Sequence, residues 1–216
     1  MLLEYQPPLW PYLDILYQDE QLVVLNKPSG LLSVPGKAPE HFDSLQYRVQ
    51  RVWPQATVVH RLDMATSGVM VMALTKAAQR ELNRQFQQRL TAKRYIALVQ
   101  GQPRANIGSI ELPLICDWPN RPKQKVCFEY GKPSLTHFRV LQRYSESSRL
   151  ELEPVTGRSH QLRVHIQAIG HPILGDKFYA TAKTPTAPRL QLHAAELMLW
   201  HPASGARLQF AAACPF

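Results

Sequence analysis

The stretch His60-Arg61-Leu62-Asp63-Met64-Ala65-Thr66-Ser67-Gly68 lies between two apolar runs, Thr57–Val59 before it and Val69–Leu74 after it. This alternation predicts a short polar loop that leaves one buried strand and enters the next through Gly68. Arg61 and Asp63 would then stand two residues apart on a loop with a rigid base, a common position for binding and catalytic groups. An ordinary surface turn with one ion pair fits the same residues. Other parts of the chain distinguish the two interpretations.

The charge balance of the chain indicates a polyanionic partner. With 216 residues, the chain can form one large domain or two small ones around a proper core. Apolar residues make up 45% and charged residues 19%, an ordinary globular composition. Lys and Arg number 25 against 16 Asp and Glu, which gives a net charge of +9 and favours nucleic acid as the partner. An acidic membrane surface is the rival, but the sequence has no basic amphipathic helix with a broad apolar face.

Cysteine usage and the N-terminal sequence predict a cytoplasmic protein without metal. The cysteines, Cys116, Cys127 and Cys214, are odd in number and have no C-x-x-C spacing, which argues against a disulfide framework or a zinc site. Met1–Trp10 lacks the basic and apolar regions of a signal peptide. No apolar run has the length needed to span a bilayer. We therefore expect a reducing compartment, the cytoplasm, and no membrane partner.

Apolar periodicity and turn residues predict many strands and few helices. Strands are expected at Ile15–Tyr17, Leu22–Leu25, Val69–Leu74, Lys93–Val99, Ile110–Tyr144 with a loop at Asp117–Lys125, Leu150–Glu153, Gln191–Trp200 and Arg207–Ala212. Helices are expected at Ser44–Trp53, after a cap at Thr75 as far as Arg89, and after a cap at Ser159 as far as Ile169. Because strict βαβ alternation is missing, we predict an α+β fold with a mixed, mainly antiparallel central sheet flanked by helices and loops.

The domain organisation expected from the sequence is simple. No repeat, low-complexity segment or linker-like shift in composition interrupts the chain, so residues 1–216 are predicted to form a single catalytic domain. Residues 1–12, rich in Pro and aromatics, are expected to be an extended N-terminal arm. We expect no separate N-terminal binding domain, and the chain is predicted to be a monomer.

Basic side chains suggest several RNA-binding surfaces. Lys27 ends a predicted strand and faces either a ligand or solvent. The outer face of the second helix is basic, and the loop at Asp117–Lys125 interleaves basic residues with an aromatic, as suits a phosphate backbone with a stacked base. The charged residues on these two surfaces are Lys76, Arg80, Arg121, Lys123 and Lys125. Ordinary solvated charge remains an alternative for each surface.

Two more patterns accompany the first, Lys93-Arg94-Tyr95 and the run GRSHQLRVH at Gly157–His165. Together with HRLDMATSG they resemble the pseudouridine synthases of the RluA family. The resemblance extends through Asn26–Gly30, Gly170–Asp176 and Leu192–Ala194, and covers the chain from about Asp14 to Phe210. The run Cys116–Pro122 is similar to members that have only the catalytic domain and modify both ribosomal and transfer RNA.

The resemblance implies an enzyme that flips specific uridines out of structured RNA and isomerises them to pseudouridine, without cofactor or metal. The implied substrates are RNA of the large ribosomal subunit and the anticodon stem-loop of transfer RNA. The implied catalytic residues are Asp63 as the catalytic aspartate, Arg163 as its paired arginine, and Tyr95, which stacks on the target base. The implied base-flipping and RNA-binding residues are Arg61, which fills the space of the flipped uridine, His60, and Leu192 as an apolar wall.

Two other function classes compete with this interpretation. A non-catalytic RNA-binding or remodelling protein could use the same fold. A nucleoside hydrolase or glycosylase would release free uracil, but that chemistry favours two carboxylates flanking the bond, and the sequence offers one candidate, Asp63. The histidines near the motifs have spacings that do not suit a metal site on one helix face. They are His60, His160, His165 and His193.

Overall fold

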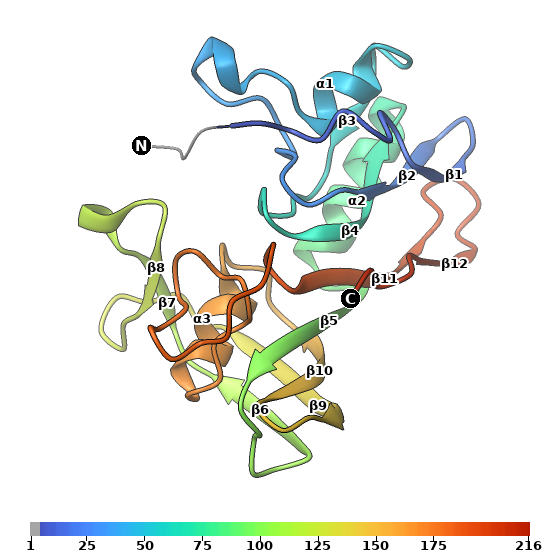
Figure 1. Ribbon diagram of the computed structural model, residues 1–216. Helices are drawn as coiled ribbons and strands as arrows, with labels where there is room; N and C mark the ends of the chain where they lie inside the picture. Colours follow the sequence, from blue (N-terminus) through green and yellow to red (C-terminus); the bar gives the residue numbers. More distant parts are fainter. Residues whose placement is uncertain (1–4) are drawn as a thin grey trace. The chain divides into compact units, whose positions relative to one another are not determined.

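The computed structural model describes residues 5–216 (Figure 1). The chain divides into two compact units, Met1–Lys93 with Ala194–Pro215, and Arg94–His193 with Phe216. It passes from the first unit to the second within β5 (Ala92–Gln100) and returns within β11 (Leu192–Trp200).

The first unit is built on antiparallel strand pairs. β1 (Ile15–Gln18) and β2 (Leu22–Lys27) form the predicted hairpin, and β2 pairs with β4 (Ser67–Ala73). The short β3 (Thr57–Val58) also pairs with β4, so the polar stretch at residues 60–66 connects two strands of one sheet, as predicted. β12 (Arg207–Ala211) pairs with β11 from Glu196 onwards and completes the predicted final hairpin.

Two α-helices of the first unit begin at a capping side chain, and the cap predicted at Thr75 is confirmed. Ser44 accepts a hydrogen bond from the backbone of Tyr47 at the start of α1 (Leu45–Gln50), which follows the 3-10 turn η1 (Pro39–His41). Thr75 accepts one from Ala78 at the start of α2 (Lys76–Gln87). α2 packs against β4 because its apolar stripe joins the alternate residues of the strands in one core. The members of that core are Leu22, Val24, Val69, Val71, Ala73, Ala78, Leu82, Leu197, Leu199, Phe210 and Ala212.

The N-terminal segment is bound along α1. Residues 5–12 contain no helix or strand, as expected for an arm, and residues 1–4 of the predicted arm lie outside the described residues. The buried guanidinium of Arg48 donates to the carbonyls of Pro8 and Tyr12 and forms a 2.7 Å ion pair with Asp43. The arm is therefore held by a charged group of the helix.

The second unit contains an antiparallel sheet in the order β5, β10 (Ser147–Pro154), β9 (Leu135–Arg143) and β6 (Ile107–Glu111). β7 (Leu114–Cys116) and β8 (Gln124–Val126) form a separate hairpin, whose connection contains the 3-10 turn η2 (Trp118–Asn120). The predicted helix of this unit is α3, which spans Gln161–Ala168.

The face of the sheet that α3 covers can be identified from Thr136 in β9. Its hydroxyl is 2.9 Å from Nδ1 of His165 and 3.0 Å from Nε2 of Gln161, both on α3. Side chains two residues apart on a strand share a face, so Phe138 lies on the α3 side together with its cross-strand partner Leu152. Tyr95 is opposite Leu152 in β5 and therefore belongs to the same face.

The predicted α+β class with a mainly antiparallel sheet is confirmed, and two local predictions need correction. Ser159 is not the cap of α3; His160 occupies that position with a left-handed backbone, φ +53°, and makes no side-chain cap bond. The side chain of Gln161, the first residue of α3, is bonded to the preceding loop, since its Oε1 accepts from the backbone N–H of Arg158 at 3.0 Å. The loop predicted at Asp117–Lys125 also ends early, because Gln124 and Lys125 already belong to β8.

Candidate active site

The loop that carries Asp63 is held from beneath by a buried lysine. Lys27 is fully buried at the end of β2, and its ammonium donates to the carbonyls of Pro28, Leu31 and Met64 at 3.0, 2.7 and 3.1 Å. A buried ammonium needs such acceptors, and backbone carbonyls supply them here. The expectation that Lys27 binds RNA is therefore wrong, because its charge is directed into the protein and supports the loop.

Two serines fix the backbone on either side of Asp63. Ser33 donates to the carbonyl of Leu62 at 2.6 Å and accepts from the N–H of the same residue at 3.1 Å. Ser29 donates to the carbonyl of Ala65 at 2.6 Å, and Gly30 donates its N–H to Met64 at 2.8 Å. An ordinary surface turn exchanges its carbonyls with water, whereas this loop uses them for tertiary contacts. The carboxyl group of Asp63 consequently projects from a backbone of defined position, as a catalytic group requires.

His60 anchors the start of the loop to the core. Its Nε2 accepts the backbone N–H of Val71 at 3.0 Å, and its ring stacks on Phe86 with the centroids 4.6 Å apart. Burial, together with the positive charge of Lys93, lowers the pKa of His60 to about 3. The imidazole is therefore neutral at physiological pH and supports α2 and β4. Its expected RNA contact stays a prediction.

Gly68 ends the loop at a position where only glycine fits. Its φ of +117° disfavours any L side chain, and an added Cβ would overlap the backbone of Ala194 in β11. Close approach of β4 to this part of β11 therefore depends on the absent side chain. Arg61, in contrast, is exposed on the loop.

Arg163, in the first turn of α3, is held by a carboxylate that the sequence analysis did not single out. The guanidinium makes two hydrogen bonds to Asp176, from Nε at 2.8 Å and from an Nη at 2.7 Å, and both side chains are nearly inaccessible. Phe178 and Tyr179 place their rings 5.2 Å from the guanidinium carbon. A bidentate pair of this kind fixes the plane of the arginine as well as its charge. Asp176 ends the motif Gly170–Asp176, so the motif contained this residue without indicating its partner.

Tyr95 and Leu192 are the other predicted pocket residues of the second unit. Tyr95 is half-buried in β5 on the face that α3 covers, the side of the sheet to which Arg163 also belongs. Leu192 begins β11 and is 3% exposed. The contacts of Tyr95 and Leu192 with the target base stay predictions.

The basic residues predicted to bind RNA lie on two surfaces. Lys76 and Arg80 are exposed on α2 in the first unit, and Arg121 and Lys125 are exposed on the β7–β8 hairpin in the second, with Lys123 half-buried. Arg121 stacks over Trp118, 4.7 Å from the ring centre, and Lys125 is 3.4 Å from a carboxylate oxygen of Asp117. Two further exposed aromatic residues of the hairpin region were missed: Phe128 and Tyr130, 79% and 71% exposed.

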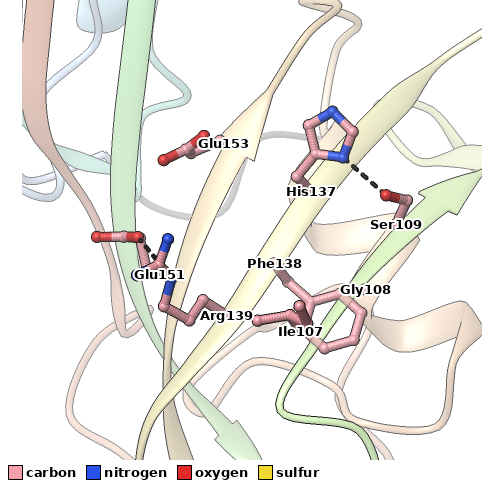
Figure 2. Close-up of a pocket in the computed structure, with 8 residues that line it drawn as sticks. All are labelled: Ile107, Gly108, Ser109, His137, Phe138, Arg139, Glu151 and Glu153. Atoms are coloured by element: carbon pink, nitrogen blue, oxygen red, sulfur yellow. Dashed lines mark hydrogen bonds and ion pairs between the residues drawn. The ribbon is translucent and has the colours of Figure 1, made fainter.

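A groove of about 310 Å³ is lined by residues of β6, β9 and β10 in the second unit (Figure 2). Its polar side chains bond to one another: Ser109 is 2.7 Å from His137, and Arg139 is 3.6 Å from Glu151. Glu151 also pairs with Arg94 at 3.2 Å. The residues that line the groove include none of the predicted site residues, and Glu151 is already paired with Arg139 and Arg94, so we do not place the reaction there.

Residues 5–216 contain no group of three or more His, Cys, Asp or Glu side chains arranged to hold a metal ion. The helices of the same residues are all too short or too polar to cross a bilayer. The three cysteines are free thiols.

Comparison with known proteins identifies the family. The model of the RNA pseudouridylate synthase family matches residues 21–168. The dual-specificity RNA pseudouridine synthase RluA of Escherichia coli (strain K12) is 58% identical over 214 residues, 98% of each chain. The protein of the same name from Salmonella typhimurium is 60% identical over 208 residues, 95% of each chain. The solved structure of human RNA Pseudouridylate Synthase Domain Containing 1 has a TM-score of 0.79 at 30% identity, covering 94% of this chain and 84% of that one.

This chain belongs to the RNA pseudouridylate synthase family. It is an enzyme that isomerises uridine in RNA to pseudouridine, and the interpretation as a non-catalytic binding protein is not favoured.

Proposed function

We propose that the chain modifies specific uridines in two kinds of RNA, the large-subunit ribosomal RNA and the anticodon stem-loop of transfer RNA. The proposal rests on the 58% and 60% identity to relatives named as dual-specificity enzymes, over nearly the full length of both chains. The net charge of +9 suits both substrates equally, because it acts on phosphates rather than bases.

Asp63 is the proposed catalytic residue, and the observation that carries this assignment is the support of its loop by Lys27, Ser29 and Ser33. The reaction breaks the bond between C1′ and N1 of uridine, turns the uracil, and joins C1′ to C5. The hydrogen on C5 leaves to water, and N1 gains one. A carboxylate is ionised near neutrality and can act without an activating base, either by adding to the sugar or by removing a sugar proton.

Arg163 and Tyr95 take the roles that the family resemblance implies. Arg163 provides a fixed positive charge that favours an ionised aspartate, and its own orientation is set by Asp176. Tyr95 offers a flat ring with a polar edge for stacking on uracil, and Leu192 an apolar wall. Arg61 is exposed two residues before Asp63 and takes the space of the flipped nucleotide.

We further propose that the two units work as one catalytic domain, since the family match at residues 21–168 runs through both of them. The enzyme acts as a monomer, because one chain carries every proposed catalytic residue, and it uses neither metal nor cofactor, because the reaction is redox-neutral and needs no added group. The free cysteines support a cytoplasmic location.

The substrate proposal is tested by mapping pseudouridine directly. Unmodified transcripts of large-subunit ribosomal RNA and of transfer RNA are incubated with the protein, treated with a carbodiimide that marks pseudouridine, and read by reverse transcription. New stops in both RNAs support dual specificity. Stops in one RNA alone reject dual specificity but leave the reaction intact, and release of free uracil would indicate glycosidase chemistry instead.

A further inference from the structure

We propose that Tyr179 is a positioning residue that couples the β7–β8 hairpin to Arg163. The proposal rests on the proposed function, in which Arg163 serves the reaction and the hairpin binds RNA. Tyr179 lies three residues after Asp176 and belongs to none of the motifs that suggested the catalytic residues. All the interactions that support the coupling lie within the second unit.

The hydroxyl of Tyr179 joins two separate elements. The backbone N–H of Gln124, the first residue of β8, donates to it at 2.7 Å. Nδ1 of His160, at the start of α3, lies 2.7 Å from the same oxygen. A hydroxyl has one proton and two lone pairs, so it can accept from Gln124 and donate to the imidazole at the same time. The hairpin and the beginning of α3 are thus linked through one atom.

The rest of Tyr179 contacts the arginine and its carboxylate. Its ring lies 5.2 Å from the guanidinium carbon of Arg163. Its backbone N–H donates to Oδ1 of Asp176 at 3.2 Å, the same oxygen that accepts from Arg163 at 2.7 Å. A displacement of the tyrosine therefore acts on both members of the ion pair.

His160 shows that this connection is built at a conformational cost. Its left-handed backbone, φ +53°, is unfavourable for a residue with a side chain, and it does not cap α3. The imidazole is instead directed to Tyr179 and lies nearly parallel to Phe178, with the ring planes 19° apart. Local strain of this kind persists where surrounding interactions hold it in place.

The coupling gives the hairpin a role in catalysis. Lys123 and Lys125 flank Gln124 directly, and β8 lies against α3 (Figure 1). When phosphates bind these lysines, the backbone of Gln124 is restrained, and through Tyr179 so is the guanidinium of Arg163. Binding energy from a remote part of the RNA is thereby used to orient a group at the reaction.

Tyr179→Phe removes only the hydroxyl and keeps both the ring and the backbone N–H. We expect kcat to fall about 5- to 20-fold, the effect of removing one orienting hydrogen bond, with little change in the affinity for RNA. Lys125→Ala should lower kcat in the wild type but not in the Tyr179→Phe background, because the link is already broken. Tyr144→Phe is the matched control, since the hydroxyl of Tyr144 bonds to the exposed Gln142, and its kcat should equal that of the wild type.

A second readout does not depend on turnover. In protein with 15N-labelled arginine, the Nε–H signal of Arg163, assigned with Arg163→Lys, should shift when an anticodon stem-loop RNA is added, and should not shift in Tyr179→Phe. The coupling would be overturned if Tyr179→Phe and Lys125→Ala lowered kcat independently, so that their effects multiplied in the double variant. It would also be overturned if the Nε–H signal of Arg163 still shifted on RNA addition in Tyr179→Phe. If the wild type modifies no RNA, the proposed function fails, while the Arg163 signal still decides the coupling.

Discussion

The ammonium of Lys27 donates a 3.1 Å hydrogen bond to the carbonyl of Met64, the residue that follows Asp63. A side chain expected to face RNA thus holds the backbone next to the proposed catalytic carboxylate. The motif Asn26–Gly30 therefore supports the motif His60–Gly68 through hydrogen bonds to its backbone.

Replacing this lysine tests the support directly. Lys27→Met keeps the apolar stem but removes the ammonium donor from three carbonyls, of which that of Met64 retains the N–H of Gly30, so we expect a loss of about 2–3 kcal/mol in the free energy of unfolding. kcat should fall more than about tenfold, because Asp63 loses its defined position. Urea unfolding and single-turnover kinetics measure the two effects. Lys37→Met, at an exposed lysine of the same unit, should change neither; equal effects from both substitutions would count against the supporting role.

Gly68 offers a second test, of the close approach between β4 and β11 at the end of the loop. Gly68→Ala introduces a Cβ that overlaps the backbone of Ala194 as well as an unfavourable φ, so we expect about 2–4 kcal/mol of destabilisation. Gly205→Ala meets open space at a φ of +70° and should cost only about 1 kcal/mol. Thermal and urea unfolding of both variants separate the overlap from the backbone strain. Equal losses would mean that β4 and β11 can move apart.

His60 predicts a pH dependence of stability. Its pKa of about 3 in the folded protein lies below the ordinary value of about 6.5, so the unfolded chain takes up a proton first as the pH falls. The contribution of His60 is complete above about pH 6.5 and decreases between that pH and about 3. Between about pH 7 and pH 4.5, the free energy of unfolding of the wild type should fall by about 1–2 kcal/mol more than that of His60→Gln. This is less than the full pKa difference would give, because the ring is partly accessible. Burial also lowers the pKa of His165, but this effect is common to both proteins. Parallel stability curves would show that folding does not lower the pKa of His60.

The basic surfaces predict the salt dependence of RNA binding. Arg121→Ala combined with Lys125→Ala should reduce the slope of log affinity against log salt by about one unit for each phosphate that the variant no longer binds. Lys76→Ala with Arg80→Ala tests the surface of α2 in the same way. Filter binding between low and moderate salt gives the slopes. A double variant whose slope equals that of the wild type would show that its surface binds no phosphate.

Sequence periodicity predicted the elements that bury one face. α2 was found because Ala78 and Leu82 recur at helical spacing, and β10 because leucine alternates with glutamate. The cap of α3 was misplaced, because propensity favours Ser159 whereas His160 holds that position with a left-handed backbone, φ +53°. The ring of His160 contacts Tyr179 and Phe178, and local pattern cannot reveal such tertiary contacts.

The chemistry of the site was predicted by motif, and its support was not. Lys27 lies 37 residues before Met64, and Arg163 lies 13 residues before Asp176, so no periodicity connects either pair. Both pairs depend on tertiary folding, which brings a buried charge to its acceptors. A charged residue inside a motif therefore indicates importance without telling whether it contacts the substrate or the protein.

Release of tritium from C5 of uridine tests most directly whether Asp63 carries out the isomerisation. An RNA with tritium at C5 of its uridines must lose the label to water when C5 becomes the glycosidic carbon. We expect release by the wild type and by Glu20→Gln, an exposed carboxylate, and no release by folded, RNA-binding Asp63→Asn. Release by Asp63→Asn at the rate of the wild type would rule out Asp63 as the catalytic residue.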